Sequence, residues 1–170
     1  MTNNPISARL MHYQAQPLTL DRTRVYEQSN PSTFTKPVGF WVSVEGEQDW
    51  PAWCTSEDYG FDSLAVAHEV RITDTANIRY ITSVSEMDAF GAEFVTPTDF
   101  DVRRDRDRRF WGIGWQQVAA RYDGIMIAPY QWERRYGAEC EWYYTWDCAS
   151  GCIWNLDAIE SVTVVSAVTA

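Results

Sequence analysis

Ser43 is the side chain whose position most suggests chemistry, because it is a small hydroxyl inside an otherwise apolar and aromatic stretch. The stretch, GFWVSV at residues 39–44, follows a Pro-Val pair and alternates as a strand does. Alternation places one face of a strand in the core and the other in a cleft, where a hydroxyl can meet a ligand. Read together with His12 and the tryptophan-rich segment 146–154, this strand predicts a binding cleft.

The familiar catalytic motifs are missing from the chain. There is no GxGxxG, no GxxxxGK[ST] loop, no HExxH and no GxSxG. A Ser-His-Asp hydrolase would need His12 or His68 as its base, because the chain has no other histidine. The cysteines at positions 54, 140, 148 and 152 have no CxxC spacing, so zinc would need ligands from distant segments. We expect buried, reduced thiols.

Length and composition predict one folded domain over residues 1–170. The chain is 45% hydrophobic and 22% charged, which is typical of a globular protein. It has no apolar run near the ~20 residues that a membrane span needs, so no membrane partner is expected. The N-terminal stretch MTNNPISARL lacks the basic and apolar blocks of a secretory signal. We therefore expect a cytoplasmic protein.

The charge pattern bears on the partners of the protein. A net charge of −10 argues against a broad surface for duplex nucleic acid, which basic proteins bind through phosphates. Residues 103–109, RRDRDRR, nevertheless carry a local net charge of +3. They form either a solvated loop whose aspartates offset its arginines, or a basic loop at the mouth of a site, used for target recognition.

Periodicity predicts strands and a few helices. Strands are expected at residues 8–15, 39–44, 64–72, 78–81, 125–128, 151–156 and 161–168, with a loop at 16–37. A helical turn is expected at 50–56. A second helix should run to Phe94 from a cap at Ser83 or Ser85, and a third over 111–121. Residues 130–147 read as an aromatic, charged insertion.

The order of these segments is similar to the ADP-ribosyltransferase fold. A histidine on the first strand is followed by a Gly-aromatic-x-Ser strand, a helix, a Tyr-Asp-Gly-Ile strand and a late acid before a strand. The blend of GFWVSV, YDGIMIAPY and WYYTWDCASGCIWN resembles small phage and bacterial proteins near that fold, from about residue 10 to 168. The resemblance implies an α+β domain with a split, curved mixed sheet and two or three flanking helices.

The resemblance also implies a function and a cofactor site. Such proteins are mono-ADP-ribosyltransferases that consume NAD to modify a macromolecule, here expected to be a protein such as a host or defence factor. Their first-strand histidine holds the adenine-side ribose, a position matched by His12 with its neighbour Tyr13. Gln14 departs from the small Ser or Thr that usually comes two residues later. Trp41 and Ser43 match the strand that cradles nicotinamide.

The catalytic acid that the resemblance implies stands just ahead of a late strand. Asp147 is the first match, and Glu141, or Glu139 in the same acidic run, is the second. Cleavage of the nicotinamide–ribose bond develops positive charge on the ribose, as in other oxocarbenium-like transfers. A carboxylate bound to a ribose hydroxyl stabilises that charge as it forms. An aromatic wall and a hydroxyl donor would position the nicotinamide ring.

Other interpretations stay open at this point. His12, Ser43 and Asp147 could each be structural: a satisfied histidine, a bond to a neighbouring strand and a turn cap. The whole protein could be a non-enzymatic acidic inhibitor that blocks a partner enzyme, as a mimic of nucleic acid. Nine tryptophans are more than the core of a 170-residue domain needs, and they favour an aromatic cleft or an interface. A carbohydrate-binding module with coplanar exposed tryptophans is the third alternative.

Overall fold

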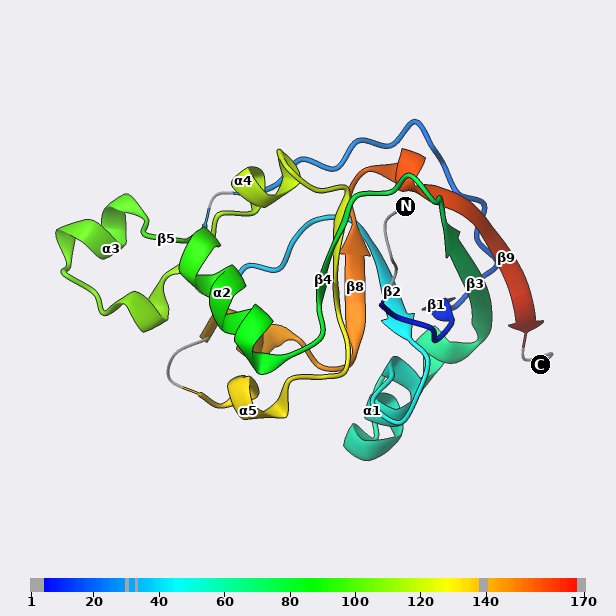
Figure 1. The fold of residues 1–170 in the computed structure, drawn as a ribbon. Coiled ribbons are helices and arrows are strands. Elements are labelled where there is room, and N and C mark those ends of the chain that lie inside the picture. The colour runs from blue at the N-terminus through cyan, green and yellow to red at the C-terminus, as the bar shows by residue number, and fades with distance from the viewer. Residues whose placement is uncertain (1–4, 30, 33, 138–140, 168–170) are drawn as a thin grey trace.

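A seven-stranded sheet organises the fold (Figure 1). The computed structural model describes residues 5–29, 31–32, 34–137 and 141–167. The sheet has the strand order β4-β7-β8-β2-β1-β3-β9. In chain order its strands are β1 (Leu10–Gln14), β2 (Phe40–Val44), β3 (Val66–Ile72), β4 (Ile78–Ile81), β7 (Gly124–Ile127), β8 (Ser150–Ile153) and β9 (Ile159–Ala167).

The sheet is mixed, as the sequence predicts. β4 and β7 are parallel, and each of the other neighbouring pairs in it is antiparallel. Its predicted strand segments all correspond to observed strands, with ends that differ by a few residues. An α+β protein with a large mixed sheet and few helices is therefore confirmed.

The pairing between β1 and β2 is short, and this local feature positions the site. The two strands pair only through Leu10 with Val44 and Met11 with Ser43. By contrast, β1 pairs with β3 along all five of its residues. Beyond Met11 the first two strands diverge, so the continuous sheet is partly split there. The pocket described below is lined by residues of both strands at this point.

Two helices are longer than five residues in the described part of the chain, α1 (Trp50–Glu57) and α2 (Val84–Phe94). Asp49 caps α1, because its carboxylate accepts from the Ala52 N–H at 2.9 Å. Ser83, the first of the two predicted caps, starts α2 by accepting from the Glu86 N–H at 3.3 Å. Glu86 in turn accepts hydrogen bonds from the N–H and the hydroxyl of Thr82, just before the cap.

The predicted helix over residues 111–121 is wrong in its first half. Residues 112–113 form β6 (Gly112–Ile113), which pairs with β5 (Val95–Thr96), and the helix α4 covers only Trp115–Ala119. Gly112 explains the difference, because a Cβ there would lie 2.1 Å from the Ser32 carbonyl oxygen. Close approach of another backbone segment thus selects glycine and extended structure over a helix.

Shorter helical elements complete the fold. They are the α-helices α3 (Asp99–Arg103) and α5 (Trp132–Arg135), and the 3-10 helices η1 (Phe61–Leu64), η2 (Arg108–Phe110), η3 (Glu141–Thr145) and η4 (Leu156–Ala158). The core packs α2, α4 and η3 against the sheet through large apolar side chains, among them Phe90, Phe94, Trp115, Trp142 and Trp146. No helix in the described ranges is long and apolar enough to cross a membrane.

The arginine-rich segment lies away from the split in the sheet. It spans α3 to η2, and Figure 1 shows α3 at the opposite end of the molecule from β9. Arg106 forms an ion pair with the buried Asp101 at 2.8 Å, and Arg109 lies over the Phe110 ring. No residue of this segment lines the pocket described below. Its role in target recognition stays a prediction.

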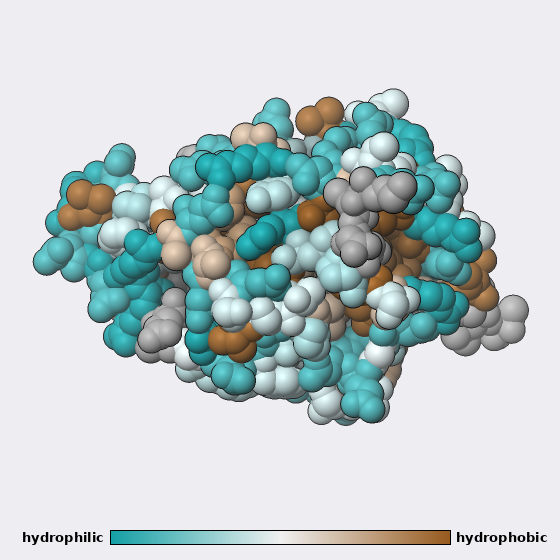
Figure 2. Space-filling view, viewed as in Figure 1, coloured by the Kyte–Doolittle hydropathy of each residue, from teal (hydrophilic) through white to brown (hydrophobic). Residues whose placement is uncertain are grey.

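Hydrophilic residues dominate the face of the molecule in Figure 2, with separate hydrophobic patches between them.

Candidate functional site

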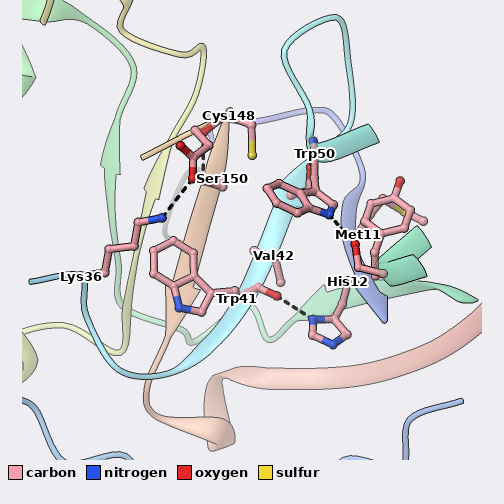
Figure 3. Close-up of a pocket in the computed structure, with 12 residues that line it drawn as sticks. Met11, His12, Lys36, Trp41, Val42, Trp50, Cys148 and Ser150 are labelled. Atoms are coloured by element: carbon pink, nitrogen blue, oxygen red, sulfur yellow. Dashed lines mark hydrogen bonds and ion pairs between the residues drawn. The ribbon is translucent and has the colours of Figure 1, made fainter. Parts of the chain in front are cut away.

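A pocket of about 370 Å³ opens where β1 and β2 diverge (Figure 3). This volume lies within the range of about 300–1,000 Å³ that small-molecule sites occupy. Aromatic and apolar side chains make up most of its wall, with a few polar groups among them. The lining residues are Met11, His12, Tyr13, Lys36, Trp41, Val42, Ser43, Trp50, Ser63, Asp147, Cys148 and Ser150.

His12 bridges the gap between the diverging strands. Its Nδ1 lies 2.8 Å from the Trp41 carbonyl oxygen, and because a carbonyl only accepts, Nδ1 carries the proton. The imidazole stacks on Phe40 with centroids 4.4 Å apart. Burial lowers the pKa of His12, so at neutral pH the ring is uncharged and Nε2 is an acceptor.

This environment predicts the titration of His12. Its folded-state pKa lies below the value of 6.5 that an unfolded chain would show, so the unfolded state binds more protons. The free energy of unfolding should therefore fall as the pH drops below about 6.5. We expect NMR titration of the imidazole C–H signals to give His12 a midpoint below 6.5, with His12→Gln assigning the signal. A midpoint at or above 6.5 would contradict the burial of the ring, because the hydrogen bond to Trp41 acts in the opposite direction and raises the pKa.

Trp41, Ser43 and Tyr13 line the pocket in different ways. Trp41 is half-buried and packs edge-on against Trp146, with centroids 4.9 Å apart. The Ser43 side chain is buried, and its Oγ accepts from the Trp50 N–H at 2.8 Å, which fixes the first turn of α1. Its own O–H remains able to donate. Burial raises the pKa of Tyr13, so its phenol stays protonated.

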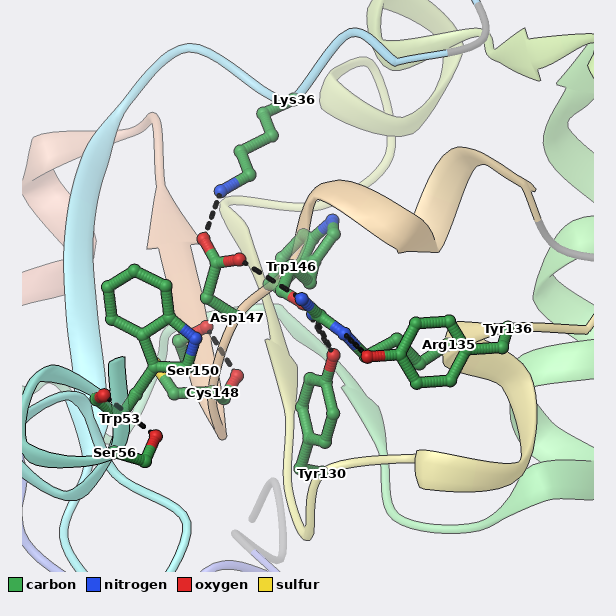
Figure 4. A network of polar contacts seen from close by, with 10 residues as sticks. All are labelled: Lys36, Trp53, Ser56, Tyr130, Arg135, Tyr136, Trp146, Asp147, Cys148 and Ser150. Atoms are coloured by element: carbon green, nitrogen blue, oxygen red, sulfur yellow. Dashed lines mark hydrogen bonds and ion pairs between the residues drawn. The ribbon is translucent and has the colours of Figure 1, made fainter. Parts of the chain in front are cut away.

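Asp147 lies between two cations (Figure 4). Its Oδ2 is 3.3 Å from Lys36 Nζ, and its Oδ1 is 3.6 Å from Arg135 Nη2. Arg135 is itself held by Tyr130 and by the Trp146 carbonyl. The segment before β8 thus holds the carboxylate in place while leaving lone pairs on both oxygens. The Asp147 carboxylate can therefore accept a hydrogen bond from a hydroxyl group of a ligand.

The two predicted acids do not occupy equivalent positions. Asp147 lines the pocket with His12, Trp41 and Ser43, whereas Glu141, on η3, is not among its described lining residues. Glu139, the other acid considered, lies outside the described residues. Sequence reasoning missed Lys36 and Arg135, which reach Asp147 from segments 111 and 12 residues away along the chain. Lys36 had one available signal, since it is the only lysine in the chain.

A second pocket of about 260 Å³ adjoins the first at Asp147, which lines both. Its other described walls include Trp53, Trp132, Tyr136 and Arg135. The tryptophans therefore contribute to pockets as well as to the core. Trp132, 55% exposed, is the only one of the nine that is largely exposed, so a row of coplanar exposed tryptophans is not observed.

The cysteines of the described residues are buried, free thiols at positions 54, 148 and 152. Burial raises the pKa of Cys148, which lines the first pocket, to about 12. A thiol with such a pKa is protonated at neutral pH and is a weak nucleophile. Cys148 therefore contributes to the apolar wall of the pocket and not to covalent chemistry.

Comparison with protein families, with curated proteins and with solved structures found no match for this chain.

Proposed function

We propose that the first pocket binds NAD and that the protein transfers ADP-ribose from NAD to a macromolecular acceptor. One observation carries this proposal: a histidine on β1, an aromatic residue and a serine on β2 and a carboxylate before β8 line one pocket. Their elements lie in the same order along the chain as in the ADP-ribosyltransferase motifs. As part of the same proposal, the α+β fold is of the ADP-ribosyltransferase type.

The chemistry follows from the types of side chain. The bond between nicotinamide nitrogen and ribose carbon breaks with its electron pair leaving on nicotinamide. Positive charge then develops on the ribose, where Asp147 accepts a hydroxyl hydrogen bond that strengthens in the transition state. The acceptor's nucleophile forms the new bond to the same carbon and loses its proton to solvent. Trp41 supplies the aromatic wall for the ring.

The test is incubation with NAD labelled in its adenylate part, together with a cell extract. The proposal expects binding of NAD, release of nicotinamide and label on a macromolecule. Calorimetry that finds no affinity of this protein for NAD would contradict the proposal. Digestion of the labelled product with protease or nuclease identifies the class of the acceptor.

A second candidate is a non-enzymatic binding protein that recognises a partner through the same region. The ion pairs of Asp147 favour it, because a carboxylate flanked by Lys36 and Arg135 is already partly neutralised. In that case the partner binds and no nicotinamide is released from NAD. The two functions therefore separate in one experiment that measures binding and turnover together.

A further inference from the structure

Lys36 is the one lysine of a chain that contains thirteen arginines, and it lies on the wall of the first pocket (Figure 3). We propose that this pocket takes ligands that carry a phosphate group and that Lys36 binds the phosphate. The inference rests on the proposed function, since NAD is such a ligand, and it adds the residue that recognises the charged part. None of the predicted NAD contacts on β1 and β2 carries a charge that could do this.

The backbone on both sides of Lys36 is anchored, so its position is defined by the fold. Before it, the Thr35 carbonyl accepts from the buried Trp115 Nε1 at 2.7 Å. After it, Val38 exchanges two hydrogen bonds with the Gln28 side chain, at 2.7 and 2.9 Å. A lysine on a free loop would lose backbone entropy as well as side-chain entropy on binding. Anchoring of its backbone removes part of that loss.

The charges around Asp147 leave Lys36 available to a ligand. Two cations face one carboxylate, and Arg135 reaches it from the side of the second pocket. Lysine has three N–H donors, and Asp147 accepts one of them at the long distance of 3.3 Å. Among the described residues that line the first pocket, Lys36 alone is positively charged at neutral pH, because His12 is uncharged.

Aromatic side chains beside Lys36 supply a surface for the ring of a phosphate-bearing ligand. Its ammonium lies 5.3 Å from the Trp41 ring centroid, and Trp50 lines the same pocket. The side chain is 36% exposed, so its free donors can reach a ligand. An aromatic surface next to an ammonium group fits a molecule that joins a flat ring to a phosphate. Nicotinamide mononucleotide is the smallest such portion of NAD.

The experiment compares two ligands that differ only in the phosphate. Calorimetry measures nicotinamide mononucleotide and nicotinamide riboside against the wild type, Lys36→Gln, Lys36→Arg and the control Arg24→Gln. Arg24 is exposed and does not line the pocket, so its replacement matches the loss of charge alone. We expect the wild type to prefer the mononucleotide about tenfold, as for one charge-assisted hydrogen bond. Lys36→Gln should lose that preference with riboside affinity unchanged, while Lys36→Arg and Arg24→Gln keep it.

The single lysine permits a direct second measurement. Reductive methylation with ¹³C-formaldehyde labels Lys36 and the N-terminal amine, whose NMR signals differ in pH dependence. Nicotinamide mononucleotide and inorganic pyrophosphate should shift the Lys36 signal, and the riboside should not. Equal losses for both nicotinamide ligands in Lys36→Gln, or an unshifted signal with every phosphate compound, would overturn the inference. If the mononucleotide binds with Lys36 unaffected, only the inference fails. If pyrophosphate alone binds, the phosphate site stands and the proposed function fails.

Discussion

Replacing Asp147 with asparagine is expected to reduce the rate of ADP-ribose transfer about 10²–10³-fold while leaving NAD binding within a few-fold of the wild type. Asparagine keeps the size of the side chain but has no negative charge to stabilise the developing ribose cation. The measurement is release of nicotinamide under saturating NAD, together with a calorimetric dissociation constant. A loss of binding equal to the loss of rate would place Asp147 in ground-state recognition instead.

Glu141→Gln is the matched control for this experiment. Glu141 is the other acid that the sequence motif allows, and it lies six residues earlier on η3, outside the lining of the pocket. Its rate should stay within about twofold of the wild type. The Asp147 change should also cost less than about 1 kcal/mol of stability, because Asp147 is partly exposed and its ion pairs with Lys36 and Arg135 are long, at 3.3 and 3.6 Å. Transfer lost in Glu141→Gln and kept in Asp147→Asn would reverse the assignment of the acid.

Trp154→Ala is expected to lower the free energy of unfolding by about 3–5 kcal/mol. Trp154 follows β8, is 8% exposed and packs near Trp115, with centroids 6.4 Å apart. Its Nε1–H donates to the Tyr122 carbonyl oxygen at 2.5 Å, so truncation leaves both a cavity and an unsatisfied acceptor. A loss of this size is a large part of the about 5–15 kcal/mol that stabilises a typical domain.

Urea unfolding followed by circular dichroism measures this effect. Trp132→Ala is the control, since that side chain is 55% exposed and should cost less than about 1 kcal/mol. An unchanged slope with denaturant would show that the two variants differ from the wild type in stability alone. A loss below about 1 kcal/mol for Trp154→Ala would contradict the packing at the end of β8.

The strands could be predicted because short apolar and aromatic runs mark them, although β7 and β8 are buried at every position and do not alternate. In FWVSV, Phe40, Val42 and Val44 belong to the core cluster, and Trp41 and Ser43 line the pocket together with Val42. Segment 111–121 could not be predicted in the same way. Its apolar spacing fits a helix, but the approach of the Ser32 backbone to Gly112 is a tertiary contact that no local pattern reports.

The same distinction between local patterns and tertiary contacts applies to the residues of the site. His12, Trp41, Ser43 and Asp147 lie in short motifs, and all of them line the first pocket. The ion pairs of Asp147 could not be predicted, because Lys36 lies between β1 and β2, outside every helix and strand of the described residues. Contacts between distant segments depend on the path of that chain, which is set by anchors such as the Trp115 bond to Thr35.

The two residue pairs that join β1 to β2 divide the sheet into a four-stranded and a three-stranded part. Few backbone bonds cross this seam, so relative rotation of the two parts costs less there than between any fully paired strands. The His12 link to the Trp41 carbonyl spans the same seam. A ligand bound between β1 and β2 would contact both parts of the sheet and restrict their relative motion. The backbone amides of β1 and β2 should then exchange more slowly with solvent.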